Sequence, residues 1–404
     1  MSSQAQPHHL AIDAQALREA VEAHQRYLGG RSGGRRLSLT YADLANTTLE
    51  GLDLREADFA GANFHGATLA RANLARAILF GSDLREADMR RANLSQADLR
   101  GACLRGANLA GAELPGCDLR EGRIALQDKL DGFRILRHEH RPGELSYAIL
   151  SGANLAGAQM SGAVAMSSDF TDANLSGAML AGAKLTRAVL DGADLSGADL
   201  TGADLSGASM KRTVLSGTNL DQANLSDVDM SDVLRAPAPV VYVDDRPIDA
   251  VLDDYENYCD SGGARGAVSD LSNADFRAMP TLKGRRFTAM VARGAVFFGL
   301  DLQNVQFQGA DLSGCDLRGC DLREADLRGA KLSGATLTRA DLRGAKLGPL
   351  TIADGRFVRT DFTRATLRNA DLRGAHAVRA RFLEADMTGA NLDGCDLTNA
   401  ELEV

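Results

Sequence analysis

Few residues of this 404-residue chain combine the types and the spacing that chemistry requires. The strongest local motif is His138-Glu139-His140, whose imidazole and carboxylate groups are common metal ligands. The two histidines are two residues apart, whereas the zinc-binding histidines of a metalloprotease helix are four apart on one face. No third ligand stands out in the sequence around them. We therefore interpret the motif as part of a solvated loop and expect no metal or other cofactor.

The cysteines and the glycine clusters also lack a chemical pattern. No two of the six cysteines form a Cys-x-x-Cys pair, so we predict neither a zinc site nor a disulfide framework. The clusters at Gly29–Gly34 and Gly262–Gly266 lack the Gly-x-x-x-x-Gly-Lys-(Ser/Thr) spacing of a phosphate-binding loop, and we interpret them as helix ends. No Ser-His-Asp arrangement or carboxylate pair stands out, so we expect that the chain is not an enzyme.

The acidic residues gather in one part of the chain. Between Asp221 and Asp260 there are 11 acidic and 2 basic residues, an excess equal to the formal net charge of −9 of the whole chain. A general nucleic-acid binder would instead carry a basic excess. Carboxylates near a helix start also stabilise the helix dipole, so part of the cluster has a structural use. We predict a docking patch for a protein partner, with these candidates: Asp244, Asp245, Asp253 and Asp254.

An apolar residue recurs every five residues over most of the chain. The first run extends from Leu39 to Ile124, the second from Leu145 to Met230, and the third from Leu282 to Leu402. A small residue, most often Ala, stands two residues before each of these positions, so that one unit reads Ala-(Asp/Asn)-Leu-x-x. On a helix of 3.6 residues per turn this spacing would form no apolar stripe.

The period fits an extended chain that turns a corner in every unit. Residues two apart point the same way in extended backbone, so Ala and Leu face inward while the Asp or Asn between them faces outward. The two remaining residues, often including Gly, can form the turn. Successive coils then stack about 4.8 Å apart through backbone hydrogen bonds. The absence of Trp and the low aromatic content of 5% agree with a narrow interior.

The unit resembles that of the pentapeptide-repeat family, and the match is specific. The segments ADLSGADLTGADLSGA (Ala193–Ala208) and CDLREADLRGAKLSGATL (Cys320–Leu337) are almost the family consensus. The resemblance implies an all-β fold, a right-handed quadrilateral β-helix with four units in each coil. It also implies that the Leu and Ala side chains stack inside the coils.

The repeats divide the chain into two modules, stacked or linked, each with a short helix in front. Asp13 to Leu28 and Ile248 to Cys259 have helical apolar spacing, and each is followed by glycines. An open solenoid end exposes its core and its strand edges, so a covering helix is expected. We predict a cap helix and Gly-rich link at 1–35, a solenoid at 36–235, an acidic linker with a second cap helix at 236–265, and a second solenoid at 266–404.

Residues 125–144 interrupt the first solenoid over about the length of one coil. The interruption is either an irregular coil or a projecting loop, and we expect the loop, since long excursions from a compact fold are often functional. Its polar residues are candidates for binding a partner: Arg134, Arg137, His138 and Arg141.

A row of arginines is the third candidate surface. In a coil of four units, residues 20 apart lie on one face, so we predict that Arg339, Arg359 and Arg379 stack. We assign Arg318 and Arg356 to the same side. Like charges about 4.8 Å apart repel each other, which a purely structural ladder would avoid. We therefore predict that this face binds an acidic protein surface, unless neighbouring Asp or Glu residues screen it.

Two classes of function fit such a rod. The first is a non-catalytic protein-interaction scaffold. The second is a DNA mimic that protects or inhibits DNA gyrase, which the resemblance implies for some family members. A rod of about 15 coils is about 73 Å long and would need about 43 negative charges to match duplex DNA. The net charge of −9 therefore favours the scaffold, with an unknown protein as partner.

The last residues, Glu401 to Val404, are still in repeat phase. An uncovered last coil would expose Leu392, Leu397 and backbone edges that can pair with another chain. We therefore expect a homodimer through residues 385–404. No secretory signal or long apolar span stands out, so we expect a cytoplasmic protein with no direct contact to membranes or nucleic acid.

Overall fold

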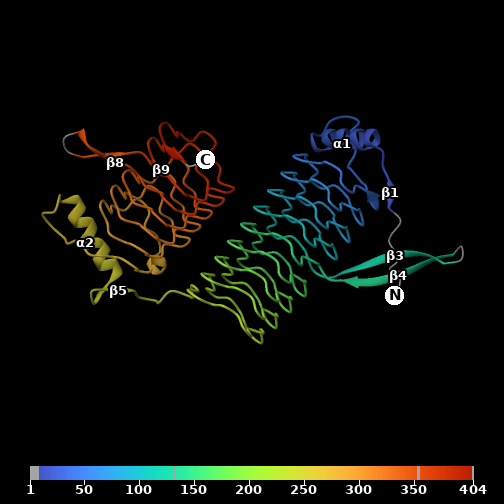
Figure 1. Cartoon of the computed structure of the whole chain (residues 1–404), viewed down its shortest axis with the longest axis horizontal. Coiled ribbons are helices and arrows are strands. Elements are labelled where there is room, and N and C mark those ends of the chain that lie inside the picture. The colour runs from blue at the N-terminus through green and yellow to red at the C-terminus, as the bar shows by residue number, and fades with distance from the viewer. Residues whose placement is uncertain (1–8, 131–132, 353–354, 403–404) are drawn as a thin grey trace. The chain divides into compact units, whose positions relative to one another are not determined.

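The structure is a computed structural model that describes residues 9–130, 133–352 and 355–402, with side chains outside residues 124–138. Stacked coils form a fold of the β-helix type (Figure 1). The chain divides into two compact units, one that ends at Ala236 and one that begins at Pro237.

Parallel backbone pairing between successive coils holds each unit together. Most bridged residues lie 20 residues apart, as do Asp194 and Val214 in the first unit. The amides of the inward Leu residues donate to the coil that follows, and Leu195 N lies 2.9 Å from Val214 O. One coil therefore takes 20 residues, or four units of five.

A tight turn follows the Leu of each unit. In the unit around Leu195, the Ala198 amide donates to the Leu195 carbonyl at 2.9 Å. Gly197 has a φ of 64°, the left-handed conformation that the third residue of a type II turn requires. The Asp194 carboxylate accepts a hydrogen bond from Ser196 N at 2.9 Å, which explains the Asp or Asn before each Leu.

Leu and Ala side chains fill the interior of both units, as predicted. Leu195 and Ala198 in the first unit are at most 1% exposed, and so are their counterparts in the second. Phe replaces Leu at several positions, and in the second unit some rings of successive coils stack. Phe362 and Phe382 have ring centroids 4.9 Å apart and nearly parallel planes. The interior accepts single rings as well as stacked ones, since three with Leu in the neighbouring coils are also fully buried: Phe59, Phe64 and Phe170.

The first unit begins with a short strand and a helix. Strand β1 (Leu10–Ala11) pairs in parallel with β2 (Ala42–Asp43). Helix α1 (Ala14–Leu28) confirms the helix expected at Asp13 to Leu28. The Asp13 carboxylate accepts from the amides of the first turn at 2.8 and 2.9 Å, which caps the helix as predicted. Apolar residues of α1, among them Leu17 and Val21, pack against the first core.

His24 connects α1 to the first coil. Its side chain is completely buried. Nδ1 accepts a hydrogen bond from Leu37 N at 3.1 Å, so Nε2 carries the proton and donates to Arg55 O at 3.0 Å. Only the neutral imidazole can make both bonds. Burial lowers the pKa of His24 below its ordinary value of 6.5, which agrees with this assignment.

The interruption of the first solenoid is a β-hairpin. Strands β3 (Gly122–Leu130) and β4 (Phe133–Arg141) pair antiparallel and leave the coils (Figure 1). Across the hairpin, bridged residues lie 41 apart instead of 20, as do Cys103 and Glu144. The segment is therefore a projection and not an irregular coil, and it begins before the expected residue 125. Ile124, the last member of the first run, belongs to β3 and not to a coil.

The second unit begins with a small hairpin and a helix. Strands β5 (Tyr242–Val243) and β6 (Arg246–Pro247) pair antiparallel and lead into helix α2 (Ile248–Asp260), one residue longer than predicted. Leu252 and Tyr255 of α2 are buried in the second core, and the Tyr255 hydroxyl donates to Thr288 O at 3.1 Å. A 3-10 helix, η1 (Phe276–Ala278), lies within the first coil.

A second hairpin interrupts the second unit at residues 349–358. Strands β7 (Leu350–Thr351) and β8 (Phe357–Val358) pair antiparallel, and the bridged residues on either side lie 30 apart, as do Lys331 and Asp361. The third apolar run passes through this segment in phase, yet Ile352 and Phe357 are exposed. The prediction that both residues belong to a coil was wrong. The ten inserted residues are two units long, so the five-residue apolar phase continues unchanged through the hairpin. The last described coil pairs β9 (Arg381–Phe382) with β10 (Glu401–Leu402).

The contacts of His24 predict a pH-dependent stability. The folded state holds His24 neutral, so its contribution is present above pH 6.5 and is lost as the pH falls through the lowered folded pKa. Between about pH 7 and pH 5 we expect the first unit to lose on the order of 1 kcal/mol through this group. Urea unfolding at a series of pH values, followed by circular dichroism, measures the loss.

The control separates His24 from the many carboxylates. The His24→Asn variant should lose this part of the pH dependence, because the titrating group is gone. The His376→Asn variant should retain it, since His376 is exposed in the second unit. Equal pH profiles for the wild type and the His24→Asn variant would contradict the assignment.

Candidate protein-interaction surface

The second hairpin changes the predicted arginine row. Because the insertion adds ten residues between coils, Arg339 N pairs with Arg368 O, at 2.9 Å, and not with the coil position of Arg359. Arg359 and Arg379 keep the 20-residue spacing, since Asp361 is bridged to Arg381. The predicted stack of three arginines is therefore wrong: Arg339 lies two units, half a coil, away from the other two.

Arg318 is an internal residue of the second unit. Its side chain is only 7% exposed and forms an ion pair with Asp316 at 2.5 Å. Its guanidinium carbon lies 5.3 Å from the centroid of the Phe298 ring. A buried, paired guanidinium stabilises the coil, and its position makes it unsuited to contact a partner.

A buried threonine fixes the base of the β7–β8 hairpin. Gly329 N donates to Thr360 Oγ1 at 3.0 Å, and the Thr360 hydroxyl faces the carbonyl oxygens of Gly348 and Leu327 at 2.9 and 3.0 Å. Thr360 is fully buried. Leu350 lies so close to Gly329 that a Cβ added there would come within 2.7 Å of it. The hairpin is therefore packed against the coils at its base.

Two of the predicted arginines meet at this hairpin over one exposed aromatic ring. The guanidinium carbons of Arg379 and Arg359 lie 5.2 and 6.0 Å from the ring centroid of Phe357. Phe357 is 41% exposed, and its neighbour Arg356 is also exposed. We name this surface the Phe357 patch and define it by its members: Ile352, Arg356, Phe357, Val358, Arg359 and Arg379.

One carboxylate borders the patch. Glu401 forms ion pairs with Arg381, at 2.9 Å, and with Arg359. The hydrogen bonds from Arg381 and then from Arg359 lower the pKa of Glu401. Arg359 is therefore held in place by Glu401 on one side and by the Phe357 ring on the other. Among the described residues, the patch and its border hold three arginines and one carboxylate.

The candidate residues of the first hairpin are only partly described. The side chains of Arg134, Arg137 and His138 lie outside the described residues. Arg141 pairs with Glu139 at 3.2 Å, and His140 Nδ1 lies 2.5 Å from Glu121. Neither contact resembles a metal site.

Two of the four predicted acidic residues have internal partners. Asp253 pairs with Arg285 at 2.5 Å, and Asp254 pairs with Arg246 at 2.6 Å. These pairs attach α2 to its own unit. Asp244 and Asp245 form the turn between β5 and β6, with φ values of 50° and 59°. Within the described chain, the acidic residues around residue 250 therefore have largely structural roles.

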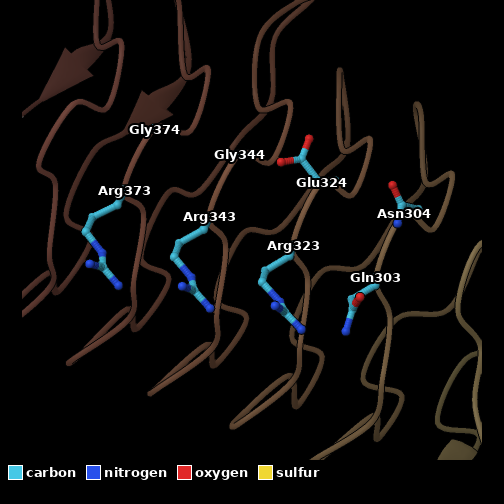
Figure 2. A pocket seen from close by; sticks show the side chains of 8 residues that line it. All are labelled: Gln303, Asn304, Arg323, Glu324, Arg343, Gly344, Arg373 and Gly374. Carbon is cyan, nitrogen blue, oxygen red and sulfur yellow. The ribbon is translucent and has the colours of Figure 1, made fainter.

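A ladder of arginines that we did not predict lines a shallow groove on the second unit. Figure 2 shows Arg323, Arg343 and Arg373 in parallel on successive coils. The groove has a volume of about 510 Å³ and is lined by these residues: Gln303, Asn304, Arg323, Glu324, Arg343, Gly344, Arg373 and Gly374. The repeated Asp-Leu-Arg at 321–323, 341–343 and 371–373 was the sequence signal.

The groove arginines carry their own counterions. Arg323 Nε and Nη2 donate to the two carboxylate oxygens of Asp321 at 2.9 and 2.6 Å. This bidentate hydrogen bond lowers the pKa of Asp321. Arg343 and Arg373 pair in the same way with the Asp two residues before each. The ladder is thus neutral along its length, which leaves little attraction for an anionic ligand.

Metal clusters and reactive thiols are the remaining chemical candidates among the described residues. No group of three or more His, Cys, Asp or Glu side chains among them could hold a metal ion. The six cysteines are free, and burial raises the pKa of Cys117 and of Cys315 to about 12, so neither thiol is a nucleophile near neutral pH. In the same part of the chain, no helix has the length and apolarity of a membrane span.

A family model described as pentapeptide repeats matches the chain in eight copies. The copies fall within residues 38–121, 168–232, 282–348 and 360–399. The matches stop at 121 and at 348, where the structure places the two hairpins. No curated protein matches the chain.

Solved structures of repeat proteins are similar to the chain. HetL of the cyanobacterium Nostoc sp. strain PCC 7120, a pentapeptide repeat protein involved in heterocyst differentiation regulation, is 21% identical over 97% of this chain and 95% of its own, with a TM-score of 0.19. Rfr23 of the cyanobacterium Cyanothece 51142 is 28% identical over 32% and 89%, with a TM-score of 0.28. QnrB1, a plasmid-mediated fluoroquinolone resistance protein, is 20% identical over 50% and 92%, with a TM-score of 0.28.

The hairpin base yields a matched pair of predictions. Thr360→Val keeps the shape but removes the hydroxyl that accepts from Gly329 N and faces two carbonyl oxygens. It leaves Gly329 N only the longer bond to Gly348 O at 3.3 Å, so we expect a loss of about 1 kcal/mol in the free energy of unfolding. Thr338 is also buried, but its hydroxyl has no partner among the described residues. Thr338→Val should therefore be neutral or stabilising. Denaturant unfolding of both variants tests this, and equal losses would show that Thr360 has no special role.

Proposed function

The chain belongs to the pentapeptide-repeat family, and on this basis we propose that it is a non-catalytic scaffold that binds a protein partner. The observation that carries the proposal is the Phe357 patch. An exposed ring stands between two guanidiniums on a hairpin that is inserted into a rigid stack of coils.

The composition of the patch suits a protein interface. Aromatic residues and arginines are enriched at interface cores and supply most of the hot spots. Arg379 and Arg359 hold the Phe357 ring in one orientation, and Thr360 fixes the hairpin base. A surface that is ordered before binding loses less conformational entropy when a partner docks. The patch is therefore suited to anchor a partner through the ring.

The charge of the patch indicates the partner's chemistry. Arg359 and Arg379 lie against the ring, Arg356 precedes it in the chain, and Glu401 pairs with Arg359 at the border. A partner surface with an apolar pocket and acidic residues around it would complement both features. This retains the acidic partner expected from the sequence, but on the patch and not on a straight row of arginines.

The proposal includes the finer architecture of the rod. We infer right-handed coils with four sides, in which α1 and α2 cover the first coil of each unit. The 20-residue spacing of the bridges and the burial of Leu252 and Tyr255 in the second core support this. The homodimer through residues 385–404 and the cytoplasmic location stay predictions.

Modulation of DNA gyrase by DNA mimicry is the alternative. Duplex DNA presents one negative charge for about every 1.7 Å of its length. Many carboxylates of the first unit are instead neutralised by arginines two residues away, as in Asp83 with Arg85 and Asp98 with Arg100. This pairing leaves fewer free negative charges than mimicry requires. Inhibition of gyrase supercoiling by the purified chain, with or without a fluoroquinolone, would favour the alternative.

A double substitution tests the scaffold at the Phe357 patch. Phe357→Ser with Arg379→Glu removes the ring and reverses one charge, and both side chains are exposed, so the fold should be kept. Affinity purification from the native host with quantitative mass spectrometry should show at least one protein that falls by about tenfold or more.

The first unit supplies a matched control. Arg105 lies 5.2 Å from the ring centroid of the exposed Tyr147, the same arrangement as Arg379 on Phe357. Tyr147→Ser with Arg105→Glu should leave the captured proteins unchanged. Identical captured proteins for the wild type and both double variants would contradict a binding role of the patch.

A further inference from the structure

The last coil of the first unit has an open backbone edge inside the chain. In the coil before it, Leu200 N, Leu205 N and Met210 N donate to carbonyl oxygens of the last coil at 2.8–2.9 Å. The corresponding amides of the last coil have no hydrogen-bond partner among the described residues. Six of them stand at the Leu and turn positions of three successive units: Leu220, Gln222, Leu225, Asp227, Met230 and Asp232.

The side chains of this coil are uncovered as well. Inward residues of the preceding coils, such as Leu200 and Leu205, are fully buried. Leu220 and Met230 on the last coil are only partly buried, and Leu225 is 37% exposed. In contrast, α2 buries Leu252 and Tyr255 against the first coils of its own unit. The edge therefore combines a row of free amides with an apolar strip beside it.

The charged residues of the last coil are all acidic. Residues 216–234 contain four acidic residues and no basic residue. Asp227 and Asp232 stand at turn positions with φ values of 59° and 56°, and both are exposed. In earlier coils the same turn positions are held by Arg187 and Arg212. The acid is therefore a property of this coil and not a requirement of the turn.

We propose that this edge binds a basic, extended polypeptide segment, which adds to the last coil as one more β-strand. Such a strand would accept hydrogen bonds from the free amides, cover the apolar strip with alternate side chains, and place lysines or arginines against the aspartates. The site is separate from the Phe357 patch, so the proposal does not depend on it.

Charge decides between a basic segment and a second copy of the chain. Two copies that met edge to edge here would bring eight carboxylates together, of which only Asp229 of each copy has an ion pair among the described residues, with Lys211 of the preceding coil. Like charges across a strand pair are destabilising. Acidic edges also discourage unwanted self-pairing, so the same residues would exclude the second copy and select the basic partner.

Hydrogen exchange of the full chain tests the proposal directly. The probe is a synthetic nine-residue peptide of alternating lysine and valine, and the control peptide has glutamate in place of lysine. In the free protein the six amides should exchange much faster than those of Leu200, Leu205 and Met210. Because turns at 221–222, 226–227 and 231–232 place these amides on successive sides of the coil, the lysine peptide should protect those on the side that it occupies. It should slow their exchange by at least about tenfold as it saturates, and the glutamate peptide should not.

Charge-reversed variants show whether the aspartates act. Asp227→Arg with Asp232→Arg places arginine at turn positions that hold it in earlier coils, so the coil should fold. This variant should lose the protection by the lysine peptide. Glu56→Arg with Glu86→Arg changes the net charge equally at two turn positions far along the first unit, and should keep the protection.

Four results would overturn the proposal. Slow exchange of the six amides in dilute free protein would mean that the chain already covers the edge. Protection that rises with protein concentration alone would assign the edge to a second copy. No protection by the lysine peptide, or protection that survives Asp227→Arg with Asp232→Arg, would exclude a basic strand.

Discussion

The backbone ladder between successive coils is the interaction on which the structure depends. An amide in one coil donates to a carbonyl about 20 residues away, from Leu195 to Val214 in the first unit and from Leu322 to Asp341 in the second. The other features of the repeat keep this register. Leu and Ala fill the interior, the left-handed residue closes the turn, and the outward Asp or Asn caps it.

A fixed register restricts where the chain can gain residues. Extra residues cannot be absorbed by a coil whose neighbours pair on both sides, so they must leave it. Both insertions do so as antiparallel hairpins that satisfy their own backbone, β3 with β4 and β7 with β8. The ladder resumes after each one. The Phe357 patch thus stands on an insertion, where side chains are free of the Leu and Ala requirement, while Thr360 and Gly329 hold its base.

The sequence predicted what the register itself dictates. Apolar phase identified the buried Leu and Ala residues, and capping and apolar spacing identified α1 and α2 almost to the residue. The five-residue phase wrongly predicted that Ile352 and Phe357 are inward residues, because an insertion of two unit lengths leaves the phase unchanged. For the same reason, the prediction that Arg339 stacks on Arg359 was wrong. Pro349 was the available signal, since proline cannot donate to a ladder. Contacts between side chains, such as that of Arg379 with Phe357, depend on the orientation of the hairpin. The repeat pattern does not encode that orientation.

Deletion of residues 349–358 tests the central claim most directly, which is that the ladder defines the fold and the hairpin is an addition to it. The deletion joins Gly348 to Arg359 and restores a five-residue step from Leu347 to Phe362. We predict that thermal unfolding of the second unit stays cooperative, with a melting temperature within a few degrees of the wild type, about the effect of 1 kcal/mol. A large fall in melting temperature, or loss of cooperativity, would contradict the account, because Ile352 and Phe357 would then contribute to the coil.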